Sequence, residues 1–117
     1  MRRSLTKQQI IRLQADIDNV FKAGKRYSLS CFKLYVAEND LSYSRIIVIP
    51  ARHYGNSVVR NHIRRQIKEI FRTNMEMISE GRDFAVVIYP AKERNLSYED
   101  REKALIDLLR TSGSLKS

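Results

Sequence analysis

Apolar and polar residues alternate along the chain with two different periods, one typical of helices and one typical of strands. Near the start, apolar side chains recur every three or four positions, which predicts an amphipathic helix over residues 7–23. Those side chains are Ile10, Leu13, Ile17, Val20 and Phe21. Thr6 is the predicted N-cap of this helix, and Gly24 is its predicted C-terminal stop.

Two segments rich in β-forming residues follow. The runs LSCFKLYVA at 29–37 and YSRIIVI at 43–49 are separated by the polar stretch ENDLS, so we expect them to form paired strands, with Pro50 ending the second. The run FAVVIY at 84–89 predicts a further, buried strand. It lies between the break EGRD and Pro90, which supports these limits.

Helical spacing returns on both sides of that last strand. After the turn cluster HYGNS, the positions Val59, Ile63, Ile67 and Ile70 predict a second helix over about residues 58–78. Ser97 is the predicted N-cap of a last helix. That helix carries Ala104, Leu105, Leu108 and Leu109. The tail at 111–117 is mostly polar and is expected to fray.

These elements predict an α+β fold in a single domain that spans residues 1–117. The order helix, strand, strand, helix, strand, helix favours a sandwich of one sheet with helices packed mainly on one of its faces. A chain of 117 residues supports one modest hydrophobic core. The sequence shows no internal repeat and no long linker, so it is not expected to divide further.

The net charge narrows the class of binding partner. The chain has 22 Lys and Arg against 13 Asp and Glu, a formal charge of +9, which indicates a polyanionic partner such as nucleic acid. No apolar run approaches the roughly 20 residues of a membrane span, and the N-terminus MRRSLTKQQ lacks the apolar core of a secretory signal. We therefore expect a cytoplasmic protein without membrane contact. Cys31 is the single cysteine and is expected to be a small buried hydrophobe.

Positive charge concentrates in the predicted second helix. Four cations spaced four residues apart form a ridge along it, and a fifth lies beside them. The ridge is Arg60, Arg64, Lys68 and Arg72, and the fifth cation is Arg65. Glu69 is the single acid between positions 41 and 75. A row of phosphates would relieve this repulsion, whereas a solvated helix face without a partner would mix charges of both signs.

The segment ARHYGNSVVRNHIRRQIKEIFR at 51–72 resembles the signature of the bacterial ribonuclease P protein family. The outright matches are Gly55, Arg60, Asn61, Arg65, Glu69, Phe71 and Arg72, and the matches by charge are Arg64 and Lys68. The segments DIDNVFKAGK, CFKLYV, YSRIIVIP and DFAVVIYPAKERNLSYEDREKAL are similar to the family's other elements, so the resemblance covers nearly the whole chain. Departures from the family pattern occur at Ile17, His53, Asn56 and His62.

The resemblance implies a mixed, mostly antiparallel sheet of about four strands with about three helices. It also implies a left-handed βαβ crossover, as in ribosomal protein S5 domain 2-like folds, although about 98% of such crossovers are right-handed. The implied function is that of the protein subunit of ribonuclease P, in which a catalytic RNA with bound magnesium removes the 5′ leader from precursor tRNA. The implied partners are this RNA and precursor tRNA. We expect no obligate protein partner and no cofactor bound by the protein itself.

The resemblance further assigns two RNA-binding surfaces. Contact with the catalytic RNA is expected at Arg52, His53, Asn56, Arg60, Asn61, Arg64, Arg65, Lys68 and Arg72. The leader is expected in a cleft between the first helix and the open sheet face, at Ile17, Phe21, Lys22, Phe32 and Tyr35. Aromatic faces stack on bases without sequence preference, which suits a protein that serves many leaders. Core packing is the alternative for the apolar members of this cleft, and local hydrogen bonding is the alternative for Asn61.

Other functions remain open at the level of sequence. His53 and His62 show no spacing that indicates a metal site, so phosphate or solvent contact is favoured, although a two-histidine nuclease mechanism is formally open. A nuclease that uses its own magnesium would need clustered carboxylates, and the acids here are scattered. A structural or ribosomal-type RNA-binding protein would share the ridge but would not need a separate aromatic cleft. DNA binding also fits the charge.

Overall fold

The computed structural model describes residues 7–90 and 96–116, so the predicted N-cap Thr6 lies outside the described residues. The elements are the 3-10 turn η1 (Lys7–Gln9), α1 (Gln14–Ala23), β1 (Lys25–Leu29), β2 (Phe32–Glu38), β3 (Arg45–Pro50), α2 (Ser57–Thr73), the 3-10 turn η2 (Met75–Met77), β4 (Arg82–Ile88) and α3 (Tyr98–Thr111). The predicted α+β class, with a mixed four-stranded sheet and three helices, is confirmed.

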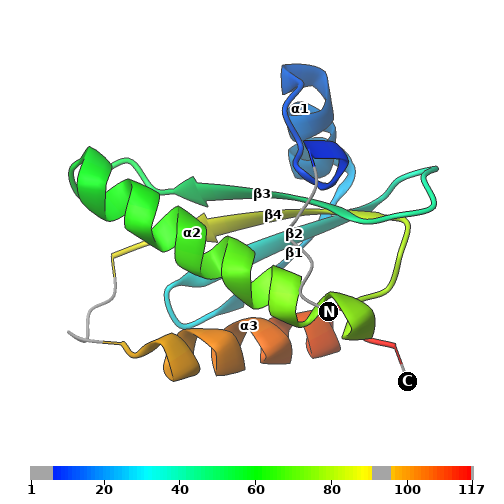
Figure 1. Cartoon of the computed structure of the whole chain (residues 1–117). Helices are drawn as coiled ribbons and strands as arrows, with labels where there is room; N and C mark the ends of the chain where they lie inside the picture. The colour runs from blue at the N-terminus through cyan, green and yellow to red at the C-terminus, as the bar shows by residue number, and fades with distance from the viewer. Residues whose placement is uncertain (1–6, 91–95, 117) are drawn as a thin grey trace.

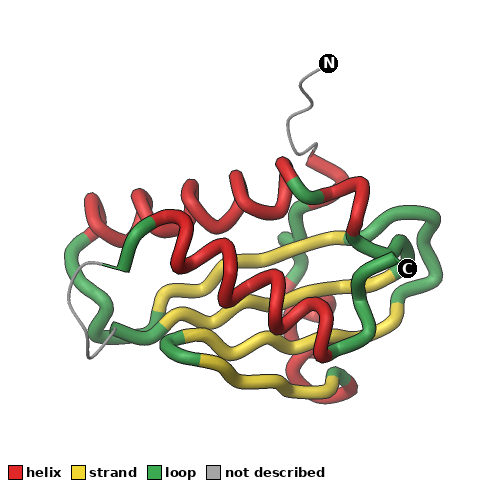
Figure 2. Tube along the Cα trace, turned by 90° about the horizontal axis from the view of Figure 1, so that it is seen from below, coloured by secondary structure: helices red, strands yellow, loops and turns green. Residues whose placement is uncertain are grey.

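The sheet has the strand order β1-β2-β4-β3. Strand β2 is antiparallel to both β1 and β4, and β3 is parallel to β4. The expected pairing of the segments 29–37 and 43–49 is therefore wrong, because β4 lies between β2 and β3. Helix α2 connects the two parallel strands, and Figures 1 and 2 together show that this crossover is left-handed.

Helices cover the two faces of the sheet unequally. Figure 2 looks onto the face covered by α2 and α3, and Figure 1 shows α1 on the opposite face, standing over one end of the strands. We call these the closed face and the open face. The expectation that helices pack mainly on one face thus holds for α2 and α3 but not for α1. The site expected between the first helix and the sheet lies on the open face.

The main core fills the closed face. Phe84, Val86 and Ile88 alternate along β4 toward this face, and all three are buried. Helix α2 contributes a stripe at helical spacing, Ile63, Ile67, Ile70 and Phe71. The rings of Phe71 and Phe84 pack with centroids 5.7 Å apart. Burying these side chains stabilises the fold by about 1.5–3 kcal/mol each.

Helix α2 begins and ends at asparagines. The Val59 N–H donates to Asn56 Oδ1 at 3.0 Å, so Asn56 is the N-cap. At the other end, Asn74 Nδ2 donates to the Ile70 carbonyl at 2.7 Å and to Glu102 Oε2 at 3.0 Å. The helix therefore stops at Thr73, not at 78 as predicted, and η2 turns the chain back toward the core.

The first helix is shorter than its apolar spacing predicted. Residues 10–13 are not helical, because the Ile11 N–H donates to the Ile46 carbonyl at 3.0 Å and this segment pairs with the edge of β3. Ile11 is buried there. Helix α1 then starts at Gln14 and ends before Gly24. Pairing with an exposed strand edge thus replaces the first turns of the predicted helix.

Strand β1 was missed by the sequence analysis. The predicted strand 29–37 is confirmed from Phe32 onward as β2, but β1 precedes it, and the two strands form a hairpin that meets at the turn Ser30–Cys31. Ser30 has a φ of 57°, the left-handed conformation that this tight turn requires. The sequence of β1, KRYSL, is mostly exposed at the edge of the sheet, so it lacks the apolar alternation of an internal strand.

The C-terminal segment, as far as Lys116, pairs with the residues around Ile78. The Ser79 N–H donates to the Ser114 carbonyl, and the Lys116 N–H donates to the Met77 carbonyl, each at 2.7 Å. Ser114 is fully buried. Helix α3, which precedes this segment, starts with a capping box between Ser97 and Asp100, as the predicted N-cap requires.

Candidate nucleic-acid interface

The cations at the two ends of the basic ridge of α2 are bonded within the protein, whereas those in the middle face solvent. At the first end, Arg60 Nη1 donates to the Ala51 carbonyl at 2.7 Å, and its Nη2 donates to the Pro50 carbonyl at 3.0 Å. These bonds tie α2 to the end of β3 and shape the intervening loop. Arg60 therefore has a structural role that the spacing of the cations did not predict.

At the other end of the ridge, Arg72 pairs with Glu69. Its Nε donates to Glu69 Oε2 at 2.9 Å, and its Nη2 makes a second contact with Oε1. The hydrogen bond to Glu69 raises the pKa of Arg72 above its ordinary value, so its cationic form is favoured. The pairing leaves Arg72 less available to an external phosphate than its position on the ridge suggests.

The middle of the ridge presents cations to solvent. Arg65 is exposed, and Arg64 and Lys68 are half-buried. Arg64 Nη1 donates to Asn61 Oδ1 at 3.1 Å, which orients both side chains on the surface. Three cations within five residues thus form a compact positive patch that carries no acid of its own.

The loop before α2 extends this patch. Arg52, His53 and Asn56 are all exposed, so the loop presents polar side chains beside the first turn of the helix. Gly55 has a φ of 149°, and a side chain there would press against Val59. Val59 itself is 44% exposed over this glycine, so it is not a core position as its spacing suggested.

The open face carries the second predicted surface. Helix α1 rests there on a small cluster of Ile11, Val20 and Ala85. Next to it, Phe21 and Tyr35 pack edge to face, with ring centroids 4.6 Å apart and planes at 63°. Phe21 is 36% exposed. The pair therefore presents aromatic surface to solvent beside a sheet face that α1 leaves largely uncovered (Figure 1).

The other predicted cleft residues lie in different surroundings. Lys22 is exposed at the end of α1. Ile17 is half-buried and packs against the small cluster beneath the helix. Phe32 is 1% exposed and lies in the main core of the closed face, so the structure removes it from the cleft. The core alternative for Phe32 is the correct one.

Strand register brings further side chains to the open face that the sequence analysis missed. Residues opposite one another on neighbouring strands share a face. One row across the sheet is Arg26, Tyr35, Ala85 and Ile47, and the next is Ser28, Lys33, Val87 and Ile49. Beyond the second row, Lys33 Nζ lies 4.9 Å from the centre of the Tyr89 ring. Lys33 is two positions from Tyr35 on the same strand, so strand alternation alone could have placed Lys33 on the face of Tyr35.

The described residues offer little chemistry for bond cleavage. No three His, Cys, Asp or Glu side chains in residues 7–90 and 96–116 are placed to hold a metal ion. Burial raises the pKa of the Cys31 thiol, so its reactive thiolate is disfavoured at neutral pH. His53 and His62 are both on the surface.

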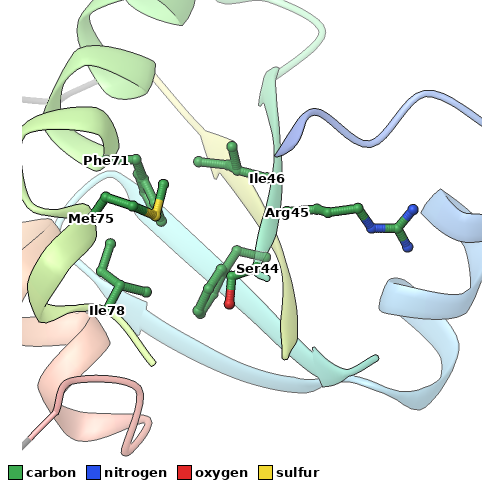
Figure 3. A pocket seen from close by; sticks show the side chains of 7 residues that line it. Ser44, Arg45, Ile46, Phe71, Met75 and Ile78 are labelled. Carbon is green, nitrogen blue, oxygen red and sulfur yellow. The ribbon is translucent and has the colours of Figure 1, made fainter. Parts of the chain in front are cut away.

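A hollow on the closed face does not alter this conclusion. It lies between the end of α2 and β3 and is lined mainly by Ile46, Phe71, Met75, Ile78 and Phe84 (Figure 3). Its lining includes Ser44, whose hydroxyl donates to the Ser79 carbonyl and accepts from the Arg82 N–H. The Ser44 hydroxyl already has both a hydrogen-bond acceptor and a donor as partners, so we interpret the hollow as a packing defect of the core.

The fold, the positive helix and the aromatic sheet face define a nucleic-acid-binding α+β domain. No helix in the described ranges is long and apolar enough to cross a membrane. The Ribonuclease P family model matches residues 5–113 of the chain. The chain therefore belongs to the bacterial ribonuclease P protein family, as the resemblance in the sequence implied. It is the protein component of an endoribonuclease, a ribonucleoprotein of tRNA processing.

Individual relatives agree with this assignment. The ribonuclease P protein component of Petrotoga mobilis is 37% identical over 109 residues, covering 89% of this chain and 91% of that protein. The protein component of Thermotoga maritima is 34% identical over 119 residues, covering 97% of this chain and all of that protein. The solved structure of the Thermotoga maritima protein matches with a TM-score of 0.78 at 29% identity, covering 86% of this chain and 94% of that chain. A Staphylococcus aureus structure shares the fold, with a TM-score of 0.81 at 22% identity and coverage of 92% and 98%.

Proposed function

We propose that the protein binds the catalytic RNA through α2 and the loop before it, and binds the 5′ leader of precursor tRNA on the open sheet face. It thereby assists the RNA in hydrolysing the phosphodiester that joins leader and tRNA. The observation that carries the proposal is the separation of two surfaces of different chemistry. One is a patch of cations on a helix, and the other is an aromatic surface on the far side of the sheet.

The positive patch suits a folded RNA. Arg64 and Arg65 offer planar forks of donors that match phosphate oxygens, and Lys68 adds a compact charge beside them. Each phosphate that they neutralise releases a condensed counterion, so binding is expected to depend strongly on salt. The exposed loop side chains Arg52, His53 and Asn56 would extend the contact beyond the helix. The charge that repels itself in the free protein thus becomes favourable on RNA.

The open face suits a single strand. Phe21 and Tyr35 present ring surface for stacking, which is worth about 1–3 kcal/mol per base and tolerates any sequence. Arg26 lies opposite Tyr35 on the neighbouring strand, Lys33 lies over the Tyr89 ring, and Lys22 is exposed next to Phe21 in the chain, so these cations can follow a phosphate backbone. A protein that acts on many precursors needs this kind of contact, because leaders differ in sequence. Sequence tolerance and backbone contact together favour a leader over a structured RNA at this surface.

The family resemblance implies that magnesium ions of the RNA–protein holoenzyme supply the reaction chemistry. The residues described here would then bind and orient RNA. The site of action would be cytoplasmic, where precursor tRNA is made and processed in bacteria. No further protein partner is needed for this arrangement.

The test is leader removal from a precursor tRNA at low magnesium concentration, with the protein alone, a bacterial ribonuclease P RNA alone, and both together. We expect efficient cleavage with both together and none by the protein alone. Cleavage by the protein alone would overturn the proposed division of labour. No stimulation of a well-matched RNA would favour the alternative, a structural or ribosomal-type RNA-binding protein.

A double variant and a matched control test the contribution of the α2 surface in the same reconstituted system. The double change Arg64→Ala with Arg65→Ala is expected to weaken binding to the catalytic RNA about tenfold or more and to lower the salt slope by about 2. The matched control is Lys103→Ala with Arg110→Ala, which removes two cations from the surface of α3. Equal losses in both double variants would show that only net charge matters, and the assignment of α2 would fail.

A further inference from the structure

Arg45 joins two carboxylates from different parts of the fold. It is the first residue of β3, opposite Asp83 of β4 on the open face. Its Nε and Nη2 donate to the two oxygens of Asp83 at 2.9 and 2.6 Å, and its Nη1 donates to Asp16 Oδ2 at 3.3 Å. Asp16 lies in the first turn of α1. Figure 3 shows the Arg45 side chain pointing away from the core hollow and toward α1.

The Arg45–Asp83 half of this arrangement is fixed. The Asp83 side chain is only 4% exposed and that of Arg45 is 18% exposed. Asn39 Nδ2 also donates to Asp83 Oδ1, at 2.7 Å. Buried bidentate pairs of this kind are rigid, because any rotation of one partner leaves a desolvated charge unpaired. The guanidinium is therefore held in place on the sheet, with Nη1 left over for a second partner.

That second partner anchors one end of α1. The other end runs into β1 through Gly24, where a side chain would lie 2.2 Å from the Val20 carbonyl oxygen and 3.1 Å from that of Val36. This close approach fixes the C-terminal end of the helix against β2. Between the two ends the helix rests on the small apolar cluster and on the contact of Phe21 with Tyr35. The segment before the helix stays paired with β3 through Ile11, so loss of the Asp16 contact would remove only the side-chain anchor of the first turn and let α1 pivot slightly about Gly24.

A pivot of α1 would move one half of the aromatic pair. Phe21 is on α1 and Tyr35 is on β2, so their edge-to-face contact at 4.6 Å depends on where the helix stands on the sheet. We propose that Arg45 is a positioning residue, which sets the angle of α1 through Asp16 and thereby holds Phe21 and Tyr35 at the spacing that accepts the leader. This inference rests on the leader-binding function proposed above.

The charge around Arg45 distinguishes a positioning role from direct binding of a leader phosphate. Arg45 faces two carboxylates, so the three groups together carry one negative charge. Such a group repels a phosphate, and each of the three guanidinium nitrogens of Arg45 already donates to a carboxylate. The two roles give opposite expectations for Asp16→Asn. Removing the carboxylate would free Arg45 and strengthen leader binding if it were a phosphate ligand, but would loosen α1 and weaken leader binding if it is a positioning residue.

The experiment compares Asp16→Asn with Asp18→Asn in the reconstituted holoenzyme. Both variants add one unit of positive charge to α1, but Asp18 is exposed and accepts from Gln14 within the helix. Affinity is measured for a precursor tRNA with a long leader and for one with a single leader nucleotide. For Asp16→Asn we expect affinity for the long leader to fall about fivefold relative to Asp18→Asn. Affinity for the short leader should be equal in the two variants, and kcat at saturating substrate should be unchanged.

Two further measurements exclude a general folding defect. The thermal midpoint of Asp16→Asn is expected to stay within about 4 °C of the parent, because a partly exposed ion pair contributes little to stability. Arg45→Lys keeps the charge but cannot make the bidentate contact with Asp83 and reach Asp16 together. It should produce the same leader-specific loss, and combining it with Asp16→Asn should add nothing further.

The outcomes distinguish this inference from the proposed function. Equal long-leader affinity in Asp16→Asn and Asp18→Asn, or a gain in Asp16→Asn, overturns the positioning role. If Phe21→Ala with Tyr35→Ala still lowers the preference for long leaders, the leader cleft itself stands. If that aromatic double variant also leaves the preference unchanged, the cleft assignment fails, and the positioning role fails with it.

Discussion

The closed and open faces of the sheet differ although the same strands build both. Along β4, Phe84, Val86 and Ile88 point to the closed face, while Asp83, Ala85 and Val87 point to the open face. The closed-face residues are covered by α2 and α3, and large apolar side chains fill the space between the layers. The open face is covered at one end only, and it mixes small, aromatic and charged side chains. Packing explains the residues of the first face, but it leaves the exposed rings and cations of the second unexplained.

The comparison predicts that substitutions on the closed face act on stability. Phe71→Ala would remove a fully buried ring that packs on Phe84. We expect the free energy of unfolding to fall by about 3–5 kcal/mol, because the cavity cannot fully collapse. Urea unfolding followed by circular dichroism measures this loss. A loss below about 1 kcal/mol would show that the closed face is not the main source of stability.

Substituting Arg60 tests whether this cation of α2 stabilises the fold or serves only the binding surface. Its two hydrogen bonds to the carbonyls of Pro50 and Ala51 involve a charged donor. Because Arg60 is half-buried and water competes for these bonds, the pair together is expected to contribute about 2 kcal/mol, near the lower end of the range for one bond to a charged group. We expect Arg60→Ala to lower the free energy of unfolding by about 2 kcal/mol, whereas Arg65→Ala should change it by less than about 0.5 kcal/mol. Equal effects in urea unfolding would mean that Arg60 acts only through its charge.

Tyr35→Ala is the matching test on the open face. The ring is half-buried and packs against Phe21 and the small cluster on the open face, outside the main core, so we expect a modest loss of stability. Binding of a single-stranded leader should weaken by about 1–3 kcal/mol, since one stacking surface is removed. Filter binding with long-leader and short-leader precursors measures this difference. A loss of the same size for both precursors would place Tyr35 outside the leader contact.

The closed face was also the part of the fold that the sequence predicted best. The apolar spacing of Ile63, Ile67 and Ile70 identified α2 because one stripe of that helix is buried. The end of the helix was placed too late, since Asn74 stops it through side-chain hydrogen bonds that periodicity does not encode. Strand β1 was missed for a related reason: an exposed edge strand has no apolar alternation.

Candidate site residues were predictable where one helix carries them. Arg64, Arg65 and Lys68 are neighbours because of helical spacing alone. The open face combines residues from α1 and all four strands, so its composition depends on strand order and register. Phe32 and Tyr35 differ by three positions on one strand and therefore point to opposite faces, which places Phe32 in the core and Tyr35 on the open face. Arg26 and Lys33 became candidates only after this register was known.

The smallest predicted effect concerns the C-terminal segment that borders the closed face. Lys116 Nζ donates to Glu80 Oε1 at 2.6 Å, and this hydrogen bond lowers the pKa of Glu80 below its ordinary value of 4.5. Because the pKa is lower in the folded state, the contribution to stability is present above about 4.5 and is lost as the pH falls through the folded-state pKa. Both groups are solvated, so we expect Lys116→Ala to leave the unfolding midpoint nearly unchanged at neutral pH. In the same variant the pKa of Glu80 should rise toward its ordinary value, as followed by NMR titration of its side-chain carboxyl carbon. An unchanged pKa would mean that the segment is held by the backbone bonds of Ser114 and Lys116 and that the ion pair does not form in solution.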